Sequence, residues 1–201
     1  SIAPLAGASP LARALSWLES AVLRPLRLFA AGQGKALLAT LALVGLYKIP
    51  DVLVAGMANP FLLELGYSKA QIAALAKVVG FGATLLGAGL GGLSVARWGV
   101  RRPLLPGVLA LAGSNLAYAA LAALGRPDPE ALALVMFVDN LAGGFATAAF
   151  VAWLSSLTTP GSSATQYALL SSLMTLPAKI LAGFAGAAVD ALGWGAFFWG
   201  T

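Results

Sequence analysis

The sequence consists mainly of apolar stretches of about twenty residues or more, separated by short polar turns. A helix needs about 20 apolar residues to cross the hydrocarbon core of a bilayer. The chain has 201 residues, of which 60% are hydrophobic and 9% charged, whereas about a quarter of the residues of a soluble domain are charged. The alternating pattern of a membrane β-barrel is missing, and open strands would leave unpaired backbone groups in lipid. The sequence therefore predicts an all-α integral membrane protein in a lipid bilayer.

The order of apolar stretches and turns predicts five complete transmembrane spans and the start of a sixth. The polar turns "GRPDPE" and "SSLTTPGSSAT" separate the third, fourth and fifth spans. We expect spans at about 36–64, 70–96, 103–124, 131–154 and 165–189, and a truncated span over 194–201. Two interpretations stay open: the chain is a piece of a longer protein, or it is a half-sized protein that pairs with a second copy.

Residues 1–35 differ in composition from the bundle predicted over 36–201. Leu11, Leu15 and Leu18 recur at spacings of three and four, and charged residues lie between them. This pattern is typical of an amphipathic helix at a membrane surface, and we expect it to be interrupted near Pro25. A linker or a disordered tail is the alternative.

The basic residues indicate the orientation of the bundle. The first segment and the second loop of the bundle carry most of them: Arg13, Arg24, Arg27, Lys35, Arg97, Arg101 and Arg102. The loops predicted on the opposite side hold only Lys69 and Arg126. Cytoplasmic loops are enriched in Lys and Arg, so the N-terminal segment should be cytoplasmic. The net charge of +5 thus has a topological origin, and we expect no nucleic-acid partner.

The sequence contains no cysteine and no histidine. The first absence excludes disulfides and thiolate metal sites, and the second removes the commonest general base and metal ligand. Ser171 or Ser172 together with Lys179 could form a hydrolytic dyad, but no nucleophile elbow or oxyanion motif accompanies them. We therefore expect neither an enzyme nor a cofactor or metal site.

Gly87, Gly89 and Gly92 form a G-x-G-x-x-G pattern, which occurs in dinucleotide-binding folds. Here it lies near the end of an apolar run rather than between a strand and a helix, and no acid follows about 20 residues later to hold a ribose. Gly87 and Gly91 lie four residues apart, which allows two membrane helices to approach closely. The pattern predicts helix packing rather than nucleotide binding.

Five ionisable residues lie inside the predicted spans: Lys48, Asp51, Lys77, Asp139 and Lys179. A charge at the centre of a membrane helix costs about 2.5–3.5 kcal/mol, so these residues should face the bundle interior or water. Lys48 and Asp51 are three residues apart and can form an ion pair. Pro50 lies between them and should break the helix beside the pair. A purely structural pair is one interpretation, but five ions favour a hydrated central cavity.

Three lysines against two aspartates suggest a cationic cavity that suits a solute with carboxylates. "DNLAGG" (139–144) places a carboxylate and an amide beside two glycines. We expect the substrate-binding residues to be Lys48, Lys77, Asn140, Gln166 and Lys179. Asp51 and Asp139 are the deep acids and thus the candidates for proton coupling.

"GGLSVARWGVRRP" (91–103) resembles the loop signature of the major facilitator superfamily, which is roughly G-G-x-x-x-D-R-x-G-R-R, and has Ala96 where the signature has the aspartate. Three longer stretches are similar to the C-terminal half of AmpG-type muropeptide permeases: "YKIPDVLVAGMANPFLLELGYSKAQIA", "DNLAGGFATAAFVAWLSSL" and "SATQYALLSSLMTLPAKILAG". The resemblance covers about 36–201. It implies a six-helix C-terminal bundle that pairs with an N-terminal half, with 1–35 as the end of the linker between the halves.

The resemblance also implies a function. Members of the family import N-acetylglucosaminyl-1,6-anhydro-muropeptides across the bacterial inner membrane by proton symport with alternating access. This import serves peptidoglycan recycling and is linked to β-lactamase induction. Two alternatives remain: a dimerising half-transporter for another anionic solute, and a non-transporting membrane interaction or scaffold protein.

Overall fold

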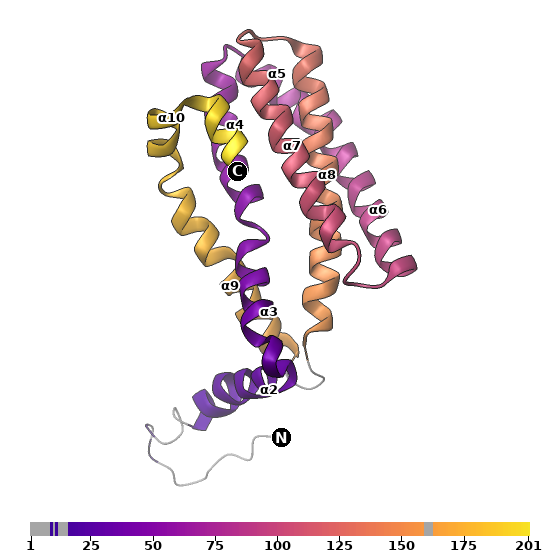
Figure 1. Ribbon diagram of the computed structural model, residues 1–201, viewed down its shortest axis with the longest axis vertical. Helices are drawn as coiled ribbons and strands as arrows, with labels where there is room; N and C mark the ends of the chain where they lie inside the picture. Colours follow the sequence, from indigo (N-terminus) through magenta and orange to yellow (C-terminus); the bar gives the residue numbers. More distant parts are fainter. Residues whose placement is uncertain (1–8, 10, 12–15, 159–162) are drawn as a thin grey trace.

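The computed structural model describes residues 9, 11, 16–158 and 163–201. Within these ranges the regular elements are all helices, and most of them run along the long axis of the molecule (Figure 1). The predicted all-α class is confirmed for the part of the chain that the structure describes. Leu15 and Arg13 of the predicted amphipathic helix, and the middle of the loop after the fourth span, lie outside the described residues.

Four helical stretches in the described ranges are long and apolar enough to cross a membrane: Arg24–Glu64, Lys69–Trp98, Leu104–Leu124 and Pro129–Ser156. The second comprises α5 (Lys69–Leu75), the π-helical turn η3 (Ala76–Gly80) and α6 (Phe81–Trp98). The third is α7 and the fourth is α8. A bent pair of helices near the C-terminus forms a fifth span if it is counted as one. These lengths and compositions are those of a multi-pass membrane protein.

The first of these stretches is broken at Tyr47 and Lys48, between α3 (Leu37–Leu46) and α4 (Ile49–Glu64). Pro50 stands in the first turn of α4 and has no N–H to donate to a carbonyl one turn earlier, which favours a break at this point. The predicted break beside Pro50 is confirmed. Pro60 lies within α4, which continues to Glu64.

The N-terminal segment forms the π-helical turn η1 (Glu19–Leu23) and α2 (Arg24–Gln33), and α2 lies across one end of the bundle (Figure 1). The predicted interruption near Pro25 is wrong. Pro25 stands in the first turn of α2, where its missing N–H removes no intrahelical bond of that helix. The chain instead changes direction at Gly34, whose φ of 51° is favoured by glycine.

The last two helices are α9 (Ser163–Ala182) and α10 (Ala185–Gly200), which meet at a bend of 69°. The span expected over 165–189 is therefore interrupted. The N–H of Gly183 is shared between two successive carbonyls, and that of Phe184 bonds three residues back, so the last turn of α9 tightens and ends. Within α10, Gly193 has a φ of 78°, which changes the chain direction again.

Helix α8 packs against both α6 and α7, and these three helices form the most closely packed part of the bundle (Figure 1). The α6–α8 contact passes through Gly87 and Gly91 on α6 and Gly144 on α8. A side chain at any of them would meet the backbone of the opposite helix. The predicted packing role of Gly87 and Gly91 is thus confirmed.

Candidate functional site

The buried apolar residues form two clusters along the bundle. One surrounds Phe61 and the other surrounds Phe150. Along α8 the first cluster reaches Met136, and the second begins at Ala142. The residues of α8 between these two points belong to neither cluster, and they include Asp139 and Asn140. A polar layer therefore lies partway along the bundle, between two apolar regions.

A pocket of about 540 Å³ opens at this polar layer, between α4, α6 and α8. Its polar lining residues are Asp51, Thr84, Asp139, Asn140 and Thr147. Most of its other lining residues are glycines and alanines. Small side chains leave room for a solute, while the carboxylates, hydroxyls and amide can bond to it.

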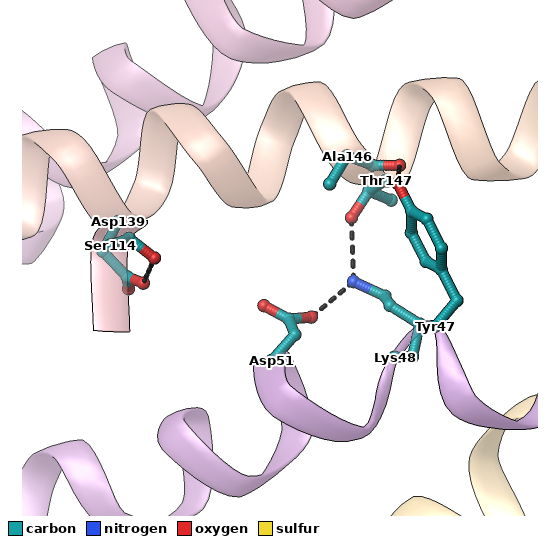
Figure 2. A network of polar contacts seen from close by, with 7 residues as sticks. All are labelled: Tyr47, Lys48, Asp51, Ser114, Asp139, Ala146 and Thr147. Atoms are coloured by element: carbon teal, nitrogen blue, oxygen red, sulfur yellow. Dashed lines mark hydrogen bonds and ion pairs between the residues drawn. The ribbon is translucent and has the colours of Figure 1, made fainter. Parts of the chain in front are cut away.

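Lys48 contacts two polar groups at the edge of the pocket (Figure 2). Its Nζ donates to the carboxylate of Asp51 and, at 3.0 Å, to the hydroxyl of Thr147 on α8. The predicted Lys48–Asp51 pair is therefore present. The exposed fraction is 13% for the lysine side chain and 30% for the aspartate side chain, so the aspartate is the more exposed member of the pair.

The helix break positions this lysine. Tyr47, the preceding residue, stacks on Phe150 of α8 with ring centroids 4.4 Å apart. Its hydroxyl lies 3.4 Å from the carbonyl oxygens of Leu104 and Ala146, on α7 and α8 respectively. The tyrosine thus fixes the break against both helices, and the next side chain points to Asp51 and Thr147 (Figure 2).

Asp139 has a different environment from Asp51. Ser114 Oγ donates to one carboxylate oxygen at 3.1 Å, and Tyr118 Oη donates to the other at 3.4 Å. Both donors are neutral and belong to α7. Among the residues that the structure describes, no lysine or arginine forms an ion pair with this carboxylate.

Asn140 joins α8 to α6 at the pocket wall. Its Nδ2 donates to the carbonyl of Met136 at 2.8 Å, and its Oδ1 accepts from Thr84 Oγ1 at 3.2 Å. The amide carries a second N–H. The side chain also lies against Gly80, at the end of the π-helical turn η3.

The structure does not bring the other predicted site residues to this pocket. Lys77 and Lys179 are exposed and are not among the lining residues. Gln166 is 1% exposed and donates to the carbonyl of Pro25 at 2.9 Å, which holds α9 to α2. The lysine excess expected for the cavity is therefore not found in the pocket itself. Asp51 and Asp139 line the pocket, and Lys48 lies at its edge.

Three residues of the polar layer were not singled out from the sequence: Thr84, Ser114 and Tyr118. Each carries a hydroxyl inside an apolar stretch, and such side chains commonly form hydrogen bonds between membrane helices without further function. Only the rotation of α6 and α7 relative to α8 shows that these three face the predicted site.

These apolar helices, with an ion pair and a polar pocket among them, are those of a multi-pass membrane protein. No family model matches the chain. The anhydromuropeptide permease of Escherichia coli K12 is 35% identical over 182 residues, which are 90% of this chain and 36% of the permease. A Rickettsia conorii protein named AmpG 4 is 36% identical over 154 residues, and a Rickettsia prowazekii protein named AmpG 1 is 33% identical over 153. Each match covers 76% of this chain, and 36% and 34% of the respective relatives.

The chain is therefore homologous, over most of its own length, to AmpG-type permeases. It spans about a third of the length of the curated relatives that it matches. The relatives are named as transporters and permeases rather than enzymes, in agreement with the expectation from the sequence.

Proposed function

We propose that the chain forms one half of a secondary transporter that imports anhydro-muropeptides by proton symport with alternating access. The cargo class follows the printed name of the E. coli relative, and we propose N-acetylglucosaminyl-1,6-anhydro-muropeptides recovered during peptidoglycan recycling. The observation that carries the proposal is the Lys48–Asp51 pair at a pocket between two apolar clusters. Ionisable residues inside a membrane bundle are costly, and they commonly mark a substrate path or a water-filled cavity.

The exposed lysines support a second bundle as partner. Lys77 and Lys179 lie in helices that are apolar enough to cross a membrane, yet their side chains are exposed in this chain. A lysine facing lipid at such a depth costs about 2.5–3.5 kcal/mol, so water or protein should cover both. We propose that an N-terminal six-helix half of the same transporter, or a second copy of this chain, faces them across a shared cavity.

The chemistry of the pocket suits a peptide-bearing anion. Muropeptides carry carboxylates, which an ammonium group such as that of Lys48 binds. Asn140 offers an amide for peptide or sugar oxygens. Asp51 and Asp139 are the two acids that line the pocket, so one of them is the proposed carrier of the coupled proton.

The arrangement of the basic residues supports the proposed orientation in the inner membrane. The loop between α6 and α7, with Arg101 and Arg102, lies at the same end of the bundle as α2 (Figure 1). Arg24 and Arg27 belong to α2. Since cytoplasmic loops are rich in such residues, we propose that this end faces the cytoplasm.

An uptake experiment tests the proposed function. The assembled transporter in proteoliposomes should accumulate a labelled anhydro-muropeptide above its external concentration when the outside is acidic. A protonophore should lower the internal concentration of the compound to the external one, because the proton gradient supplies the driving force. Saturable uptake that never exceeds the external concentration would argue against symport, and no uptake at all would argue against transport of this cargo.

Water access to the pocket separates a transporter from a scaffold. The chain has no cysteine, so a single introduced thiol is the only one within it. Ala148 lines the pocket, whereas its neighbour Ala149 on the same helix is fully buried. We expect a membrane-impermeant maleimide to label Ala148→Cys at least tenfold faster than Ala149→Cys. Equal, negligible labelling of both would favour a dry scaffold.

A further inference from the structure

Lys48 bonds to one charged partner and one neutral partner. Asp51 lies in the first turn of α4, three residues on from Lys48, and Thr147 lies on α8. The hydroxyl of Thr147 would still accept from Nζ if the carboxylate turned away. The ammonium therefore keeps a fixed place at the pocket even when its ion-pair partner changes.

The net charge of the Lys48–Asp51 pair limits which further ions can join it in the pocket. The Lys48–Asp51 pair is neutral as a whole. A carboxylate that enters the pocket adds one negative charge, and an uncompensated charge at membrane depth is strongly unfavourable. If Asp51 takes up a proton at the same time, Lys48 can pair with the incoming carboxylate and the sum remains zero.

We propose, building on the proposed function, that Lys48 exchanges Asp51 for a carboxylate of the solute while Asp51 takes up one proton. The proton comes from water on the side to which the pocket is open and forms an O–H bond on the Asp51 carboxyl. Lys48 stays protonated throughout, and release of the solute reverses each step. Proton coupling is then a property of solute binding itself.

The geometry favours exchange at Asp51. Its side chain is 30% exposed and lines the pocket, so both water and a solute reach it. The nearest wall is Gly143 on α8, where an added Cβ would lie 3.8 Å from Asp51 Oδ1. With no side chain there, an incoming carboxylate has space beside the one that it replaces.

Asp139, the other acid of the pocket, has no such connection to Lys48. Asp139 accepts hydrogen bonds from the hydroxyls of Ser114 and Tyr118, and no cation of the described chain pairs with it. Lys77 and Lys179, on η3 and α9, do not line the pocket. A carboxylate that binds Lys48 therefore competes with Asp51 and leaves the bonds of Asp139 in place.

Proton uptake on binding tests the exchange directly. The assembled transporter, in weakly buffered detergent solution with a pH indicator, is titrated with an anhydro-muropeptide. The same compound with its carboxylates converted to carboxamides serves as the matched ligand. We expect about one proton taken up per molecule of the carboxylate ligand bound and none with the carboxamide. This comparison uses the unmodified protein, so it does not depend on the folding of a variant.

Two variants assign the proton to a residue. Asp51→Asn should bind the carboxylate ligand without taking up a proton, and Asp139→Asn should still take up about one. Binding of the carboxylate ligand by the unmodified protein without proton uptake would overturn the exchange, as would uptake that persists in Asp51→Asn. Neither of these two results would argue against transport of the cargo itself. Failure of the unmodified protein to bind either ligand would instead overturn the proposed function.

Discussion

Replacing Gly87 by alanine is expected to destabilise the bundle by about 1–3 kcal/mol, the range for overpacking a tight interior. The added Cβ would lie 2.1 Å from the carbonyl oxygen of Leu141 and 3.0 Å from the backbone nitrogen of Phe145. Both contacts are with backbone, which no change of rotamer can relieve. Helices α6 and α8 would have to move apart, and the pocket between them and α4 would change shape.

Gly89→Ala is the matched control, because it changes the same residue type two positions along the same helix. An added Cβ at Gly89 meets nothing within 4 Å. Alanine is favoured over glycine in a helix by up to about 1 kcal/mol, so this variant should be as stable as the parent or more so. Chemical unfolding in detergent micelles measures both. Equal stability of the two variants would mean that α6 and α8 are not packed through Gly87.

The long helices of this fold follow from hydropathy and local chemistry. Spans were expected over 103–124 and 131–154, and the structure has α7 at Leu104–Leu124 and α8 at Pro129–Ser156. Polar turns mark these ends because a chain inside the bilayer must pair its own backbone groups. The bend after α9 left no such signal. A glycine inside an apolar sequence is compatible with a helix, with a tight contact or with a change of direction.

The candidate site was predictable where it depends on one helix alone. Lys48 and Asp51 were expected to pair because residues three apart share a helix face, and they do. The partner of Gln166 could not be predicted in this way, because it is the carbonyl of Pro25, 141 positions away along the chain. Which polar residue meets which depends on the rotation and depth of packed helices. Ser114 faces Asp139 for that reason, and the hydropathy of α7 does not reveal it.

Replacing Lys48 by methionine is expected to destabilise the protein more than replacing both members of the pair. Alone, it leaves the Asp51 carboxylate at the pocket without its cation. Removing one partner of a fully buried pair costs about 3–5 kcal/mol, and partial exposure of the carboxylate reduces this to about 1–3 kcal/mol. Adding Asp51→Asn removes the charge that was left behind, so the double variant should recover part of the lost stability.

A double-mutant cycle measures this coupling from the unfolding free energies of the parent, Lys48→Met, Asp51→Asn and the double variant. We expect an interaction energy of about 0.5–3 kcal/mol, the range for residues in direct contact. Binding of the carboxylate ligand should not recover in the double variant, because the ammonium that receives it is gone. The second substitution would then restore part of the stability without restoring binding. If both recovered together, Lys48 would act only through folding, and the pair would lock helices rather than bind a solute.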